Sequence, residues 1–252
     1  MNPDSRRGVL RLATNVKTSG INPYLPPTSA MTEPTDVLVV DPQPVCRAGI
    51  AVVLRELSAG LALREADTAA AGLTAMALAR PDLVILEINL NGPSGLDYIR
   101  QLIALHPDLK ILVFSAGPEE WYADRALRAG ARGYVMKSAS PAVFREAVKQ
   151  VRAGRFYVSP AVADLVISRL AAHGSGRTDS TSCLSDREME VFLLIGEAFG
   201  TAEIARRLRV SVSSVESYRA GIKRKLGLKN CSQLVRAAVS QVLSGNDSRK
   251  AV

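Results

Sequence analysis

The stretch "LVILEINLNGPSGLD", from Leu83 to Asp97, decides the fold. It begins with a continuous apolar run, ends that run in a carboxylate at Glu87, and continues through a glycine-bearing turn into a helical pattern at about residue 95. Short continuous apolar runs are typical of strands that are covered on both faces of a parallel sheet. The stretch therefore predicts a strand, a turn and a helix, with Glu87 at the end of the strand.

Similar units lie on both sides of this stretch. The other apolar runs are "DVLVVD" (36–41), "LALREA" (61–66), "KILVFS" (110–115) and "GYVMK" (133–137). Helical patterns alternate with the runs, at about 44–57, 68–79, 95–105, 119–129 and 141–153. Five strand–helix units predict an α/β fold with a doubly wound, five-stranded parallel sheet. In such a sheet the functional crevice lies beyond the carboxyl ends of the strands.

The second half of the chain predicts only helices. Residues 156–183 are expected to form a linker that contains one helical segment, and 184–245 a domain of four helices. The expected helix caps are Ser140 in the first half, then Ser185 (with Glu188 in a capping box), Thr201 and Ser211. Residues 1–35 are expected to be a disordered extension, either a real tail or an over-extended start before Met31, and 246–252 a tail.

Composition bounds the class of protein. The 252 residues suit two modest domains, and 47% hydrophobic with 22% charged residues is ordinary for soluble units. No apolar run approaches a membrane span, and no signal peptide is evident. The three cysteines, Cys46, Cys183 and Cys231, are widely separated, so neither a disulfide framework nor a zinc site is expected. We expect a cytoplasmic protein without a metal or another cofactor.

The net charge of +8 is unevenly distributed. Residues 36–153 carry 13 Lys/Arg and 13 Asp/Glu, whereas 184–252 carry 12 Lys/Arg and 7 Asp/Glu. A basic end joined to a neutral front indicates either a polyanion as partner or merely a solvated basic surface.

Four polar side chains are expected to meet at the carboxyl edge of the sheet: Asp41, Glu87, Ser115 and Lys137. With the segments "VVDPQPVCRAG", "VFSAG" and "GYVMKSAS", residues 36–155 resemble the receiver domain of NarL/FixJ-type response regulators. The resemblance implies that Asp41 matches a magnesium-binding acid. It also implies that Ser115 and Lys137 match the residues that bind the phosphoryl oxygens.

Two positions depart from the receiver pattern. Pro42 replaces the second acid, and Glu87 replaces the aspartate that accepts the phosphoryl group, while Asn89 stands where the family offers a backbone carbonyl to the metal. Glutamate moves its carboxylate outward by one C–C bond, roughly 1.5 Å, and a misplacement of about 1 Å can cost a hundredfold in rate. Three outcomes stay open: Glu87 pairs with Lys137 and mimics a phosphoryl group, the pocket is silent, or residual phosphorylation persists.

Other chemistries fit the sequence poorly. The turn after the first strand holds two prolines, at 42 and 44, instead of the glycines that a dinucleotide or P-loop site needs. His106 and His173 lie in loop-like contexts and are expected to be surface residues. We therefore expect a protein that is not an enzyme.

The third helix of the basic end has two different sides. At 100° per residue, Val215, Ile222 and Leu226 form an apolar stripe, and small polar residues with Arg224 lie opposite. With "LSDREMEVF" and "TAEIARRL", residues 184–243 resemble the LuxR-type helix-turn-helix domain. This implies a scaffold helix at 201–208, a recognition helix at 212–226, a dimerisation helix at 231–243, and a structural role for Glu188.

The resemblance places Glu216, Ser217 and Ala220 at the DNA interface, with Tyr218 and Arg219 near the DNA backbone. The outward side of the helix and its flanking cations add further expected contacts: Ser213, Ser214, Lys223, Arg224 and Lys225. Glu216 can accept from a cytosine amino group but repels phosphate, so it is a weak contributor to affinity. Tyr218 is expected either to contact the DNA backbone or to pack on the scaffold helix.

The sequence thus predicts a DNA-binding transcriptional regulator with an atypical receiver that works without phosphorylation. Its partners would be double-stranded DNA, read as a homodimer on half-sites about 10 base pairs apart, and a histidine kinase or another regulatory protein. Two alternatives remain open, a conventional kinase-driven response regulator and an adaptor that does not bind DNA.

Overall fold

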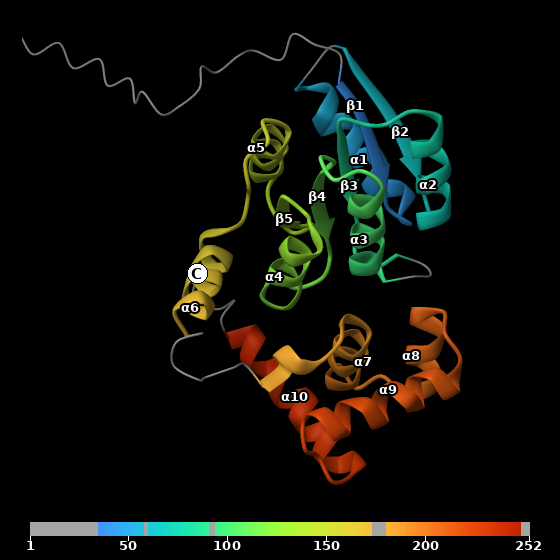
Figure 1. Ribbon diagram of the computed structural model, residues 1–252, viewed down its shortest axis with the longest axis vertical. Coiled ribbons are helices and arrows are strands. Elements are labelled where there is room, and N and C mark those ends of the chain that lie inside the picture. Colours follow the sequence, from blue (N-terminus) through green and yellow to red (C-terminus); the bar gives the residue numbers. More distant parts are fainter. Residues whose placement is uncertain (1–34, 58–59, 91–93, 173–179, 248–252) are drawn as a thin grey trace, which may run out of the picture.

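The computed structural model describes residues 35–57, 60–90, 94–172 and 180–247. A sheet with helices on both faces forms one domain, and a compact group of helices lies at its lower end in Figure 1. The expected disordered extension lies outside the described residues except for residue 35. Within the described ranges, no helix combines the length and the apolar character that crossing a membrane requires.

The sheet has five parallel strands in the order β2-β1-β3-β4-β5. Their bounds are β1 Thr35–Val40, β2 Leu61–Ala66, β3 Leu83–Leu86, β4 Lys110–Ser115 and β5 Gly133–Met136. The expected fold class is confirmed. Because β1 and β3 are neighbours and β3 and β4 are neighbours, the ends of these strands bring residues far apart in the sequence to one edge.

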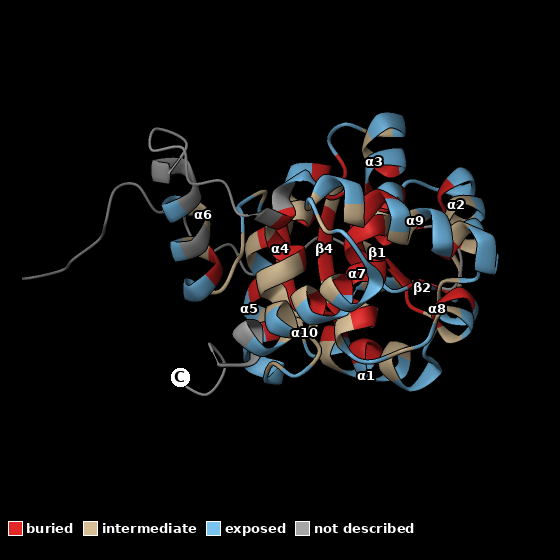
Figure 2. Ribbon diagram, turned by 90° about the horizontal axis from the view of Figure 1, so that it is seen from below, coloured by how far each residue is buried: buried red, intermediate tan, exposed pale blue. Residues whose placement is uncertain are grey.

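Five helices cover the two faces of the sheet. They are α1 Pro44–Arg55, α2 Ala69–Leu78, α3 Gly95–Leu105, α4 Glu119–Ala129 and α5 Pro141–Arg152. Alternate residues of each strand face opposite sides. Val37 and Val39 of β1 therefore pack with α1 and α5, whereas Leu38 and Val40 pack with α2, α3 and α4. The buried residues of the sheet appear as the red centre of Figure 2.

The expected linker is partly incorporated into the receiver-like domain. Tyr157 forms a parallel bridge with Gly133, which extends the sheet beyond β5. Helix α6, Pro160–Ala172, then packs against α4, and Ser159 donates a hydrogen bond to Glu119 at 2.9 Å. The glycine-rich stretch at 173–179 lies outside the described residues.

The helical domain follows a short 3₁₀ helix at Ser180–Cys183. Its helices are α7 Asp186–Gly196, α8 Thr201–Leu208, α9 Val212–Lys225 and α10 Cys231–Asp247. Ser185 and Glu188 form the expected capping box, and Ser211 caps α9 as predicted. The prediction for Thr201 is wrong by one residue, because Gly200 is the N-cap and Thr201 begins α8. Helix α10 continues two residues beyond the expected domain end at 245.

Candidate functional site

The structure brings together the four polar residues expected at the carboxyl edge. Asp41 follows β1, Glu87 follows β3, Ser115 ends β4 and Lys137 follows β5. The ammonium of Lys137 lies 2.6 Å from Asp41 Oδ2 and 2.8 Å from Glu87 Oε2. Both carboxylates are buried, with 1% of Asp41 and 2% of Glu87 exposed. The expected pair of Glu87 and Lys137 is therefore present.

The carboxylate of Glu87 accepts from several donors at once. Its Oε1 accepts from the hydroxyl of Ser115 and, at 2.9 Å, from the backbone N–H of Asn89. Its Oε2 accepts from the backbone N–H of Ala116 at 3.1 Å and faces Lys137. Hydrogen bonds to an ionised acceptor are stronger than neutral ones. The pocket therefore holds a fixed anion whose two oxygens are both engaged.

Lys137 is held as a cation by these neighbours. Burial alone would lower the pKa of Lys137, but the charges and hydrogen bonds of Glu87 and Asp41 outweigh this effect and raise the pKa. Asp41 also accepts from the backbone N–H of Gln43 at 2.8 Å. The pocket thus carries two acids and one base within ion-pair distance of both acids.

A tyrosine extends this network toward the rest of the domain. The hydroxyl of Ser115 accepts from the backbone N–H of Gly117 at 3.0 Å, and the hydroxyl of Tyr134 donates to the Gly117 carbonyl at 2.7 Å. Tyr134 is 1% exposed, and burial raises the pKa of its phenol. The turn after β4 is thereby tied to Glu87 and to β5. No sequence pattern marked this role, although the tyrosine lies in the predicted strand "GYVMK".

Helix α9 presents an exposed polar side, as predicted. Its exposed residues include Ser213, Glu216, Ser217, Ala220 and Arg224, and Ser214 and Lys223 are half-buried beside them. On the other side Val215 and Ile222 are fully buried, which confirms them as core. Leu226, expected in the core, is half-buried and packs against it.

Several residues of the expected DNA interface are engaged within the protein instead. Glu216 accepts from Thr201 at 3.1 Å, and the guanidinium of Arg219 contacts the sulfur of Cys231 on α10. Tyr218 is half-buried and packs against the hydrophobic core, and its contact with the scaffold helix or with the DNA backbone stays a prediction.

Lys225 is similarly engaged. Its ammonium lies 2.6 Å from Glu188 Oε2, on the first turn of α7. Burial would raise the pKa of Glu188, but Lys225 and Ser185 together lower it. The pair therefore fastens the end of α9 to α7, which agrees with a structural role for Glu188. Among the expected cations of α9, Arg224 is left exposed and Lys223 half-exposed.

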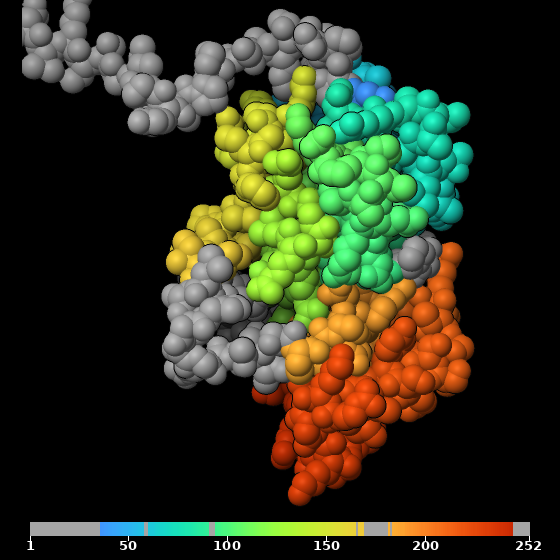
Figure 3. Space-filling view, viewed as in Figure 1, coloured from blue at the N-terminus to red at the C-terminus, as the bar shows by residue number. Residues whose placement is uncertain are grey.

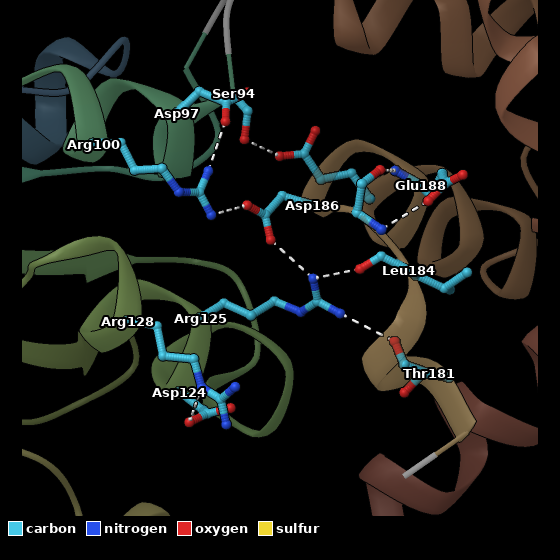
Figure 4. Close-up of polar contacts among 12 residues, drawn as sticks. Ser94, Asp97, Arg100, Asp124, Arg125, Arg128, Thr181, Leu184, Asp186 and Glu188 are labelled. Atoms are coloured by element: carbon cyan, nitrogen blue, oxygen red, sulfur yellow. Dashed lines mark hydrogen bonds and ion pairs between the residues drawn. The ribbon is translucent and has the colours of Figure 1, made fainter. Parts of the chain in front are cut away.

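An interface joins the two domains, and Figure 4 shows its polar centre. Asp186, at the start of α7, lies 2.5 Å from Arg100 of α3 and 2.8 Å from Arg125 of α4. Arg125 also donates to the carbonyls of Leu184 at 3.0 Å and Thr181 at 3.2 Å. One carboxylate thus bridges two receiver helices, and Arg125 reaches around it to the segment before α7.

A second contact lies deeper in the interface. The hydroxyl of Ser94 donates to Glu190 at 2.9 Å, and Glu190 also binds Arg187 at 2.6 Å. Burial raises the pKa of Glu190, and Arg187 and Ser94 offset this only in part. No sequence pattern marked these contacts, because the partners are separated by 96 residues for Ser94 and Glu190.

The docked arrangement leaves the polar side of α9 accessible. In Figure 1, α7 and α8 lie next to the receiver-like domain, and α9 runs on their far side. Figure 3 shows the same order in the space-filling view, with the orange helices against the green ones. The outward residues of α9 are exposed although both domains are present.

Comparisons with known proteins agree with both domains. Residues 37–149 match the family model "Response regulator receiver domain", and 182–238 match "Bacterial regulatory proteins, luxR family". The chain is 36% identical to the transcriptional activator protein ExaE of Pseudomonas putida, covering 81% of this chain and 95% of that protein. It is 31% identical to the oxygen regulatory protein NreC of Staphylococcus carnosus, covering 82% and 98%.

Solved structures show the same fold. RcsB of Salmonella enterica serovar Typhimurium, bound to promoter rprA with the phosphomimetic BeF3-, superposes with a TM-score of 0.57 at 22% identity, covering 81% of this chain and 98% of that one. A LuxR-family two-component response regulator from Aurantimonas sp. SI85-9A1 has a TM-score of 0.51 at 28% identity, covering 55% and 99%. This chain belongs to the transcriptional response regulators that join a receiver domain to a LuxR-family DNA-binding domain.

Proposed function

We propose that this regulator binds double-stranded DNA through the exposed side of α9 and that its receiver works without phosphorylation. The observation that carries the second part is the engagement of Glu87. Its carboxylate already takes the hydroxyl of Ser115 and the ammonium of Lys137, the two groups expected to bind phosphoryl oxygens. The carboxylate of Glu87 thus supplies the negative charge that a phosphoryl group would bring.

Magnesium, which receiver chemistry requires, does not fit the donors of this pocket. The ion needs a near-octahedral shell of oxygens at about 2.0–2.1 Å. Asp41 Oδ2 instead faces the ammonium of Lys137, and Pro42 offers no side-chain oxygen. Both oxygens of Glu87 already accept hydrogen bonds. The ammonium of Lys137 lies within ion-pair distance of both acids, so it supplies the positive charge that the metal would otherwise bring.

The contacts of Glu87 favour mimicry of the phosphorylated state over a silent pocket. A silent acid would be solvated, whereas Glu87 is buried and draws on four donors. Through Ser115 and Gly117 the same carboxylate is linked to Tyr134. Glu87 therefore holds the turn after β4 in one arrangement without any added group.

We expect no phosphoryl adduct on the natural chain after incubation with Mg²⁺ and a small acyl phosphate, as measured by intact-mass spectrometry. The geometric reason is the outward displacement of the Glu87 carboxylate and the missing acid at Pro42. The double variant Pro42→Asp/Glu87→Asp restores both acids and is expected to take up a phosphoryl group under the same conditions. An adduct mapped to Glu87 of the natural chain would contradict the proposal.

DNA binding is expected to depend on Arg224, an exposed cation of α9. Each phosphate neutralised adds roughly −0.9 to the slope of log affinity against log salt. The variant Arg224→Ala should bind duplex DNA more weakly and reduce the magnitude of this slope by about 1. Titrations at several salt concentrations measure both effects.

The matched control is Lys149→Ala, which removes one exposed cation from α5 of the receiver. It changes the net charge equally but lies on a different domain, so its slope should equal that of the natural chain. A flat salt response of the natural chain would favour the adaptor alternative instead. Binding as a homodimer to two half-sites is part of the same proposal, and footprint length measures it.

A further inference from the structure

A cavity of about 730 Å³ lies between the two domains. The receiver contributes residues 88–90, which follow β3, and the start of α4, including Leu90 and Trp121. The helical domain contributes α7, the end of α8 and one residue of α10, including Leu193 and Arg209. The volume is within the range of about 300–1,000 Å³ that small-molecule sites occupy.

The position of the cavity is where α/β proteins place ligands. Ile88, directly after Glu87, lines it, so the cavity opens beyond the carboxyl ends of the strands. Its walls are largely apolar on the receiver side, where Ile88, Leu90, Pro118 and Trp121 contribute. An apolar wall favours a ligand with an apolar body, and the half-buried indole of Trp121 offers a flat face for an aromatic one.

The other side of the cavity is cationic. Among the described residues that line it, four are arginines and two are acids, Glu190 and Glu197. Of these arginines, Arg187 is bound to Glu190, and Arg207 pairs with Glu203 at 3.3 Å while stacking on Phe199. Arg209 forms no ion pair or side-chain hydrogen bond with any residue in the described ranges, whereas Glu190 and Glu203 are already paired with other arginines. The excess of positive charge favours an anionic ligand.

The backbone of Arg209 adds an independent observation. Arg209 ends α8 with φ at 51°, in the left-handed region. Residues other than glycine adopt this conformation at a cost in free energy, and such strain gathers at functional sites. Glycine would adopt this φ more readily, so the arginine is held at this position at a cost in stability.

We propose that the interdomain cavity binds a small aromatic anion, a carboxylate or a sulfonate, with Arg209 holding the anionic group and Trp121 contacting the ring. The ligand would touch both domains and therefore stabilise their docked arrangement. This site is separate from the Glu87 pocket and from the DNA-binding side of α9, and it stands whether or not the proposals for those sites hold.

The test uses the full chain and 8-anilinonaphthalene-1-sulfonate as the probe. Trp121 is the only tryptophan of the protein, so energy transfer from tryptophan to the bound probe reports on this cavity. We expect saturable binding of one probe molecule per chain. The variant Arg209→Gly should weaken binding about tenfold or more, since it removes a charge-assisted hydrogen bond, and should leave the unfolding midpoint unlowered because glycine adopts this φ freely.

Two further variants control the test. Ala198 lies two residues beyond the end of α7, has a φ of 67° and is not among the residues that line the cavity. Ala198→Gly therefore gives a similar relief of strain without a change of charge. Binding to that variant should equal binding to the natural chain. Asp186 lies outside the cavity but joins the domains, so Asp186→Ala should weaken binding as Arg209→Gly does.

The opposite results would overturn the proposal. They are the absence of saturable energy transfer, equal probe affinity of Arg209→Gly and Ala198→Gly, or undiminished binding to Asp186→Ala. An uncharged analogue, N-phenyl-1-naphthylamine, should bind at least tenfold more weakly, and equal binding would remove the role of the anion. If Arg209→Gly weakens duplex DNA binding but not probe binding, Arg209 is a DNA contact and the cavity proposal fails.

Discussion

Replacing Gly95 by alanine is expected to lower the free energy of unfolding of the receiver by about 3 kcal/mol. A Cβ at this position would lie 2.3 Å from the carbonyl oxygen of Ile88 and 2.6 Å from its Cα. These are backbone atoms, so the clash is relieved only if the segment after Glu87 moves. Urea unfolding followed by the fluorescence of Trp121, which lies in α4, measures the loss.

The control is Gly49→Ala on the exposed side of α1. A Cβ there meets nothing within 4 Å. Alanine is favoured over glycine in a helix by roughly 0.5–1 kcal/mol, so this variant should gain stability. If both variants unfold at the same urea concentration, the close packing of α3 against the end of β3 would be contradicted.

Glu87→Ala is expected to cost about 3 kcal/mol, because it removes one partner from a buried ionic network. The hydroxyl of Ser115 and the backbone N–H groups of Asn89 and Ala116 lose their acceptor, and Lys137 keeps only Asp41. The same urea unfolding experiment measures the change.

Glu87→Gln separates stability from signalling. Its amide oxygen still accepts from Ser115 and its shape is nearly unchanged, so the loss of stability should be smaller, about 1 kcal/mol. The negative charge is gone, however, and under mimicry the arrangement held through Ser115 and Gly117 should relax. DNA affinity and dimerisation of Glu87→Gln equal to those of the natural chain would exclude mimicry in favour of a silent pocket.

Most of the fold and the receiver pocket followed from local patterns. Parallel strands are short apolar runs, and their carboxyl ends share one edge, so the order of elements alone predicts that Asp41, Glu87 and Lys137 meet. The apolar stripe of α9 predicted the burial of Val215 and Ile222 in the same way. These features depend on the period of a helix or strand, which the sequence records directly.

The contacts that the sequence did not reveal depend on which side chains meet across elements. No sequence pattern singled out Asp186, and its partners Arg100 and Arg125 lie 86 and 61 residues earlier. Arg219 was expected near the DNA backbone, yet it contacts Cys231 on the neighbouring helix. A helical wheel gives the side of the helix on which a side chain lies but not the residue that it contacts. That contact depends on how the other helices pack against it.

The exposed side of α9 in the docked arrangement has a consequence for the cell. When only a minor fraction of a regulator is in the form that binds DNA, its apparent dissociation constant for DNA equals the intrinsic constant divided by that fraction. If α9 contacts DNA as proposed, no opening step precedes contact with a promoter, so that penalty would not arise. Occupancy of target sites would then follow the copy number of the protein, and synthesis and turnover would be the natural means of control.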